Sequence, residues 1–177
     1  MRKVEVCSYS EKWPVLFLEE AEILKNIFGN EIINIFHIGS TSVPGLKAKP
    51  IIDIMPVVRN ISAVDKYNQL MGDIGYVPKG ENGIAGRRYF KKGGDNRSHH
   101  VHIYQIGNDQ IINHLAFRDY LRTHQDEMKQ YSVLKERLAQ QFPYNIESYI
   151  KGKENLVREI EVKALTWYET SNITNTY

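Results

Sequence analysis

The sequence predicts an α+β fold, in which a mixed β-sheet with flanking helices is followed by a C-terminal helical bundle. Strand-like and helical segments alternate over the first two thirds of the chain, whereas after Asn108 the apolar residues recur only at helical spacing. With 177 residues, 42% of them hydrophobic, the chain can bury one substantial core. We therefore expect a single domain over residues 1–177, with a mixed α/β part at 1–106 and a helical part at 107–177.

The first elements follow from apolar spacing and turn residues. Apolar side chains recur at helical spacing over Ser10–Phe28, where Pro14 suits the first turn and Gly29 suits the end. The apolar run Ile32–Ile38 then predicts a short strand. The next segment, Gly39–Leu46, is too rich in turn-forming residues to be regular and predicts a loop.

The remaining elements alternate in type and then become helical. The run Pro50–Val58 has the nearly continuous apolar character of a strand covered on both faces. After it the pattern predicts a helix at Ser62–Met71, a strand at Tyr76–Val77 and a glycine-rich turn at Gly80–Gly86. Two further strands are predicted at Arg87–Lys92 and His99–Gln105. Three helices follow, at Asp109–Arg122, Asp126–Phe142 and Ile146–Tyr168.

Charge and cysteine content exclude several kinds of partner. The chain has 23 Lys plus Arg against 21 Asp plus Glu, so no overall field attracts nucleic acid or an anionic membrane. It also lacks the interleaved aromatic and basic residues typical of nucleic-acid binding. The single cysteine, Cys7, and the charged N-terminus without an apolar signal core indicate a cytoplasmic protein. We expect no nucleic acid or membrane partner, and the oligomeric state stays open.

The loop after the first strand has the composition of a phosphate-binding turn. Gly39 lets the backbone approach an anion closely, and Ser40, Thr41 and Ser42 offer N–H groups and hydroxyls to phosphate oxygens. An ordinary loop whose hydroxyls cap its own backbone would have the same composition. The loop is a candidate because an unusual carboxylate follows it.

Asp53 lies in the middle of an apolar strand. A carboxylate buried there without a partner would cost several kcal/mol or be neutralised, so a metal, a cation or backbone donors must compensate it. Lys47 and Lys49 are close in sequence and could form a structural ion pair instead. Together with the loop upstream, Asp53 favours a functional site.

Two histidines share one face of a later strand. Strand alternation places His100 and His102 on one face and Val101 and Ile103 on the other, which we expect to face the core. Imidazoles one pleat apart suit a shared metal, a bound phosphate or proton transfer. His99 points to the opposite face and is expected to take no part.

Basic residues near these motifs are candidates for binding phosphate. Arg118 and Arg122 stand four apart on one helical face, and Lys153 falls on an apolar stripe where it would point inward. Further basic residues surround the strand pair that carries the histidines, and Lys91 and Lys92 are expected to be solvated: Arg87, Arg88, Lys91, Lys92 and Arg97.

These motifs resemble the GrpB family (UPF0157) of the DNA polymerase beta-like nucleotidyltransferase superfamily. The resemblance extends from about Trp13 to Trp167 and is carried by HIGSTSVPGL at 37–46, KPIIDI at 49–54, HVH at 100–102 and FRDYLR at 117–122. It implies a nucleotidyltransferase-like fold. The superfamily places two carboxylates two residues apart after the Gly-Ser loop, and a third on a neighbouring strand, to hold two magnesium ions. Here Met55 and Ile51 occupy the positions two residues either side of Asp53.

The resemblance and the residues together lead to one function and two alternatives. The leading expectation is an enzyme that transfers a nucleotidyl or phosphoryl group to a small acceptor. Asp53, His100 and His102 would be metal ligands or acid/base groups, and magnesium, manganese or zinc would be the divalent metal. A nucleotide would be substrate or ligand, its phosphates bound by Gly39, Ser40, Thr41, Ser42, Arg118, Arg122 and Lys153. The alternatives are a non-catalytic module that binds a nucleotide or a coenzyme A-like ligand, and a metal-dependent hydrolase.

Overall fold

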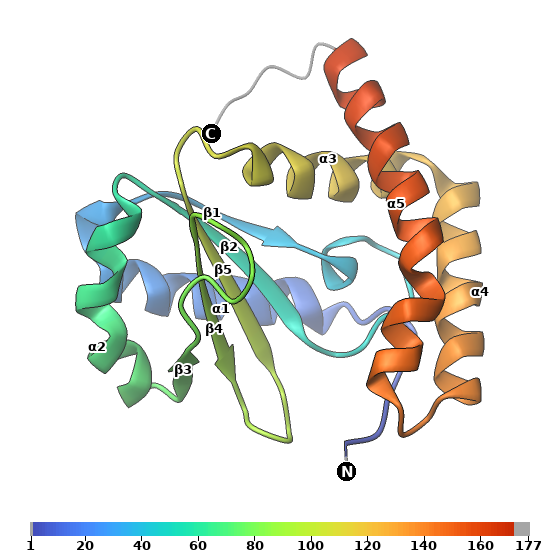
Figure 1. The fold of residues 1–177 in the computed structure, drawn as a ribbon, viewed down its shortest axis with the longest axis horizontal. Coiled ribbons are helices and arrows are strands. Elements are labelled where there is room, and N and C mark those ends of the chain that lie inside the picture. The colour runs from blue at the N-terminus through green and yellow to red at the C-terminus, as the bar shows by residue number, and fades with distance from the viewer. Residues whose placement is uncertain (1, 172–177) are drawn as a thin grey trace. The chain divides into compact units, whose positions relative to one another are not determined.

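The computed structural model describes residues 2–171, which form two compact units. One unit contains residues 11–38 and 51–111, and the other contains residues 2–10, 39–50 and 112–171. We call them the sheet unit and the helical unit. The predicted α+β class, with a mixed sheet, flanking helices and C-terminal helices, is confirmed (Figure 1). One domain over residues 1–177 stays a prediction.

The sheet unit is built on five strands in the order β1-β2-β5-β4-β3. The pair β2–β5 is parallel, and the pairs β1–β2, β4–β5 and β3–β4 are antiparallel (Figure 1). The strands are β1 at Ile32–Ile38, β2 at Ile52–Val58, β3 at Tyr76–Pro78, β4 at Arg87–Lys92 and β5 at His99–Gln105. The parallel pair places the aspartate strand directly beside the histidine strand.

One face of this sheet is covered by α1, Lys12–Phe28. Its buried side chains include Leu24 and Phe28, and it packs against β1 and β2. Val101 and Ile103 are fully buried, as the alternation along β5 predicts. Apolar burial of this kind contributes about 1.5–3 kcal/mol for each large side chain.

The segment after β2 differs from its prediction as a helix over Ser62–Met71. It begins as a 3-10 helix at Ile61–Tyr67 and becomes α-helical only at α2, Asn68–Asp73. The Asn60 side chain accepts a hydrogen bond from Ser62 N at 3.0 Å, and the Asn60 carbonyl accepts one from Ala63 N at 3.2 Å. An i→i+3 bond at the first turn tightens the helix, which apolar spacing alone does not reveal.

The helical unit contains most of α3 and all of α4 and α5. These helices span Asp109–Thr123, Gln125–Gln141 and Ile146–Thr170, and the first three residues of α3 belong to the sheet unit. The loop after β1 contributes a short 3-10 helix at Ser40–Ser42 and two side chains to the core. The buried residues of this core are Val43, Leu46, Ala116, Tyr120, Leu121, Met128, Tyr131, Ile160, Ala164 and Tyr168.

Among the described residues 2–171, no helix combines the length and the apolar composition that crossing a bilayer requires.

The turn between β4 and β5 sets the position of the histidine strand. Ser98 N donates to the Lys92 carbonyl at 3.0 Å and closes the turn. Gly93 has φ +101°, and a Cβ there would lie 2.2 Å from the Asn96 carbonyl oxygen. Gly94 also has a positive φ, +53°, but a Cβ would meet open space.

We therefore expect Gly93→Ala to lower the free energy of unfolding by about 2–4 kcal/mol, through strain and a backbone clash. Gly94→Ala is the matched control, with an expected loss of about 1 kcal/mol from its left-handed backbone alone. Urea denaturation followed by circular dichroism measures both. Equal losses in the two variants would contradict the close approach at Gly93.

Candidate metal centre

Asp53 lies on β2, next to the edge strand β1 and beside β5. Its register partners are Ile38 on β1 and His100 on β5. Its strand neighbours Ile52 and Ile54 are buried, whereas the Asp53 side chain keeps 26% exposure. The carboxylate therefore stands on the sheet face opposite α1 and is partly open to solvent.

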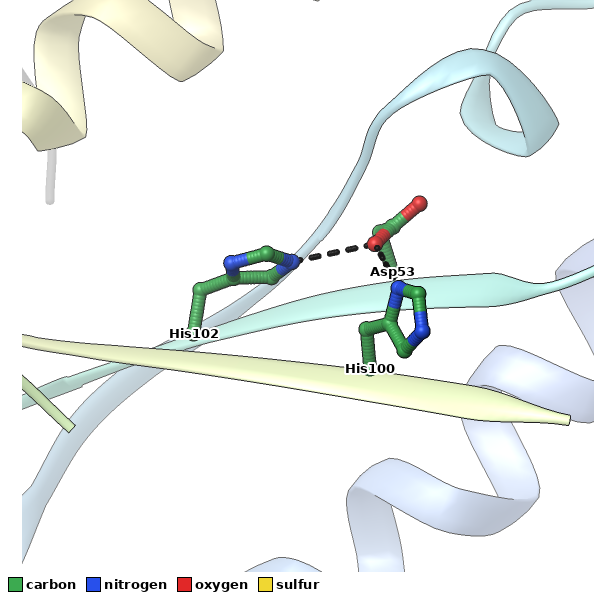
Figure 2. A group of neighbouring side chains, drawn as sticks. All are labelled: Asp53, His100 and His102. Atoms are coloured by element: carbon green, nitrogen blue, oxygen red, sulfur yellow. Dashed lines mark hydrogen bonds and ion pairs between the residues drawn. The ribbon is translucent and has the colours of Figure 1, made fainter. Parts of the chain in front are cut away.

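His100 and His102 converge on a single oxygen of this carboxylate. The distance from His102 Nε2 to Asp53 Oδ1 is 3.0 Å, and that from His100 Nδ1 to the same oxygen is 3.4 Å (Figure 2). Both imidazoles extend from the same face of β5, as the alternation predicts (Figure 2). The three residues thus form one cluster within the sheet unit.

Two opposing effects act on the pKa of Asp53. Burial alone would raise this pKa, but the hydrogen bonds and the charges of His100 and His102 outweigh burial and hold it well below the ordinary value. The carboxylate is therefore ionised at neutral pH, which is the state that a metal requires of an oxygen ligand.

The cluster fits a divalent metal. The candidate ligand atoms of Asp53, His100 and His102 all lie within 4.8 Å of one another. Metal–ligand bonds of about 2.0–2.2 Å place neighbouring ligand atoms about 3 Å apart, close to the separations between each imidazole and the carboxylate oxygen. Two imidazoles and one carboxylate suit zinc, manganese or cobalt better than magnesium, which prefers oxygen ligands.

Aromatic and basic side chains border the cluster. The Tyr89 ring, on β4, lies 5.0 Å from the His102 ring and 5.7 Å from the His100 ring, measured between centroids. Arg97, in the turn before β5, places one guanidinium nitrogen 3.3 Å from His100 Nε2. His100 therefore lies between the carboxylate of Asp53 and the cation of Arg97.

The opposite face of β5 holds a separate buried cluster. His99 Nε2 lies 3.9 Å from Oε2 of Glu20, a buried residue of α1, and burial lowers the pKa of His99. Lys92 and Tyr76 each donate to Glu20 Oε1 at 2.8 Å. His99 thus points away from the other two histidines, and the prediction that Lys92 is a solvated charge is wrong, because Lys92 is ion-paired in this cluster.

Met55 occupies the position where the superfamily pattern would place a second carboxylate. It is fully buried and lies two residues beyond Asp53 on β2. The group of candidate metal ligands among the described residues 2–171 therefore contains one carboxylate and two imidazoles.

The loop after β1 lies in the helical unit and has its own hydrogen-bond network. Gly39 has φ +72°, which allows the chain to turn directly after the strand. The Ser42 hydroxyl donates back to the Gly39 carbonyl, and Thr41 is buried. Arg122 donates to the Ser42 carbonyl through Nε and one terminal nitrogen, at 3.0 and 2.8 Å.

Lys135 is a site candidate that the sequence analysis missed. This residue of α4 is only 2% exposed, and its ammonium group donates to the Ser40 hydroxyl at 2.8 Å. It also lies 4.5 Å from the centre of the Tyr131 ring. The signal was present in the sequence, because Lys135 falls on the apolar stripe of α4 just as Lys153 falls on that of α5.

The other two basic candidates have partners of their own. Arg118 donates to Asp119 at 2.8 Å, and Lys153 lies over the Tyr149 ring at 5.5 Å. Within the helical unit, Arg122 and Lys135 thus contact the loop, at Ser42 and Ser40 respectively. Arg118 and Lys153 have other contacts.

Comparison with known proteins identifies the family of this chain. A family model for GrpB protein matches residues 3–163, and the chain belongs to this family. The UPF0157 protein YqkA of Bacillus subtilis is 54% identical over 98% of this chain and 51% of its own length, so the chain spans about half of that relative. The glutamate-rich protein GrpB of Alkalihalophilus pseudofirmus is 34% identical over 89% of this chain and 94% of its length.

The crystal structure of the conserved protein GrpB from Enterococcus faecalis is similar to this structure. It aligns with a TM-score of 0.91 at 45% identity, over 93% of this chain and 99% of that chain. The Cid1 poly(U) polymerase is a much weaker match, with a TM-score of 0.46 at 14% identity over 74% of this chain and 45% of that chain.

The cluster predicts a measurable metal affinity. We expect Co²⁺ to bind the wild-type protein with visible absorption bands from nitrogen and oxygen ligands, and Zn²⁺ to displace it. Asp53→Asn and His102→Ala each remove a ligand and should weaken Co²⁺ binding at least about 10-fold. Titration followed by absorption spectroscopy measures this effect.

Asp95→Asn is the matched control, because Asp95 is exposed in the β4–β5 turn of the same unit. Its Co²⁺ affinity should equal that of wild type. Unchanged affinity in both ligand variants would contradict a metal centre at Asp53.

Proposed function

We propose that this chain is a metal-dependent enzyme that transfers a nucleotidyl or phosphoryl group to a small acceptor. One observation carries the proposal: an ionised carboxylate near the start of the interior strand β2 is met by two imidazoles on one of its oxygens, at 3.0 and 3.4 Å. A stable fold gains little from such a group, because partly buried charges cost desolvation free energy. A carboxylate with a perturbed pKa that lies against two other titratable side chains is typical of a functional site.

In the proposed enzyme, Asp53, His100 and His102 hold a divalent cation of the manganese or zinc type. This cation would supply Lewis-acid stabilisation of negative charge on a phosphate oxygen. Asp53 Oδ1 would provide the anionic ligand, and the ring nitrogens that now face it, His102 Nε2 and His100 Nδ1, would turn their lone pairs to the cation in place of their contacts to Oδ1. In nucleotidyl transfer, an acceptor oxygen forms a bond to the α-phosphorus while the bond to pyrophosphate breaks.

Phosphate binding by the helical unit is a second part of the proposal. Ser40 and Lys135 offer a hydroxyl and an ammonium group 2.8 Å apart, and Arg122 holds the loop through the Ser42 carbonyl. A buried ammonium group favours an anionic ligand, because its charge has lost most of its hydration. Within the helical unit by itself, we assign phosphate contacts to Ser40 and Lys135, with the other predicted residues of the loop, Gly39, Thr41 and Ser42, shaping it.

A binding module without catalysis is the second candidate, and Met55 favours it. A fully buried methionine where a second carboxylate would stand makes the two-metal arrangement of polymerases unavailable to this sheet. A module of this kind would keep the metal and the phosphate-bearing ligand and would lack turnover.

Turnover separates the two candidates. We expect the protein with Mn²⁺ to release pyrophosphate from a nucleoside triphosphate in the presence of an acceptor mixture, and Asp53→Asn to lower the rate at least about 100-fold. A coupled pyrophosphate assay measures the rate, with Asp95→Asn as the control. Metal-dependent binding of the nucleotide without any release would favour the module, and inorganic phosphate released from a simple ester would favour a hydrolase.

Lys135 provides a test within the helical unit. Lys135→Met keeps the apolar stem and removes the charge, so the affinity for a nucleoside triphosphate should fall at least about 10-fold. Isothermal titration calorimetry measures it, and Lys129→Met, an exposed lysine of the same helix, is the matched control. Equal affinities in the two variants would contradict phosphate binding at Lys135.

A further inference from the structure

Strand pairing sorts the basic residues of β4 onto two faces. Arg88 and Lys92 lie on the sheet face opposite His100 and His102. They form ion pairs at 2.8 Å with Asp65 and Glu20, respectively. Lys91 pairs with His100 in the β4–β5 register and therefore stands on the face that carries the metal cluster. Arg88 and Lys92 are thus ion-paired with carboxylates on one face, whereas Lys91 lies on the face of the candidate cluster, 5.5 Å from the centre of the Tyr89 ring.

Arg97 adds a second cation to this face. Its Nε donates to the Gly94 carbonyl at 3.2 Å, and a terminal nitrogen lies 3.3 Å from His100 Nε2. Neither partner is a carboxylate, and within residues 2–171 Arg97 takes part in no ion pair. A guanidinium group has five N–H donors, so most of its donors have no assigned acceptor.

The charge at the cluster favours an anion. Asp53 is the one carboxylate among the three residues, so a divalent cation bound there would keep a net positive charge, and Arg97 adds another next to His100. An oxyanion bound between the divalent cation and the Arg97 guanidinium group would neutralise both positive charges. The planar guanidinium fork matches the oxygens of a phosphate group and binds them with two parallel hydrogen bonds.

We propose that Arg97 is the residue of the sheet unit that binds a phosphate-class oxyanion of the substrate, beside His100. This inference rests on the proposed function and names the substrate group that the same cluster takes. The anion is either inorganic phosphate or the phosphate of a larger molecule such as a nucleotide, and both present the same oxygens to the guanidinium group.

The experiment compares phosphate binding by Arg97→Met, Arg97→Lys and a control. Inorganic phosphate, and separately adenosine triphosphate, are titrated into the metal-free and the Co²⁺-loaded protein by calorimetry. Lys79→Met is the control, because it removes one exposed positive charge from the same unit. Circular dichroism verifies that each variant is folded.

We expect Arg97→Met to weaken phosphate binding at least about 10-fold in both forms of the protein, Arg97→Lys to weaken it less, and Lys79→Met to leave it within about 2-fold. Co²⁺ affinity in phosphate-free buffer should be nearly the same in Arg97→Met and wild type. If Arg97→Met loses the same factor of affinity for inorganic phosphate and for adenosine triphosphate, Arg97 recognises the phosphate group alone. A larger loss of affinity for adenosine triphosphate indicates that the ligand is a nucleotide. Both results support the inference.

Three results would overturn it. The first is equal phosphate affinity in Arg97→Met and Lys79→Met. The second is a loss of Co²⁺ affinity in Arg97→Met with unchanged phosphate affinity, since Arg97 would then only position His100. The third is a wild-type protein that binds no phosphate in either form. If Co²⁺ fails to bind wild type, the metal centre of the proposed function is contradicted, and the metal-free titration still decides the role of Arg97.

Discussion

The contacts of the Asp53 carboxylate with the imidazoles of His100 and His102 are the interaction on which the candidate site of the sheet unit depends. Asp53, the second residue of the apolar strand β2, loses hydration there, and burial alone would favour the neutral form of its carboxyl group. His100 and His102 reverse that preference and keep the charge. The rest of the unit can then be understood as the scaffold that holds two histidines of one strand against an acid of its parallel neighbour.

The alternation of β-strands separates this chemistry from a structural network on the reverse face. His99 and Lys92 face Glu20 on α1, where every charge has a partner, and His100 and Lys91 face the other way. One strand therefore presents adjacent histidines to two environments, one closed by ion pairs and one partly open to solvent. This separation explains how three consecutive polar residues, Ser98 to His100, are accommodated at the edge of a buried strand.

Much of this arrangement could be predicted from sequence, because it depends on local pattern. The strands Ile32–Ile38, Arg87–Lys92 and His99–Gln105 have the predicted bounds, and alternation alone places His100 with His102. The pairing of Asp53 with His100 depends on the register between strands far apart in the chain, which no local pattern encodes. Lys135 and Lys153 both lie on apolar stripes, yet one donates to Ser40 and the other lies over Tyr149, because neighbouring segments decide what an inward lysine meets.

The parallel pairing of β2 with β5 also has a kinetic consequence. His102 and Asp53 are 49 positions apart, with β3 and β4 between them. Closing a loop of this length costs chain entropy before the contact contributes any stability, so we expect the two strands to pair after the β4–β5 hairpin has formed. A nascent chain that has emerged from the ribosome only as far as β4 would carry the acid on an exposed strand edge, and the imidazoles would reach it only when synthesis of β5 is complete.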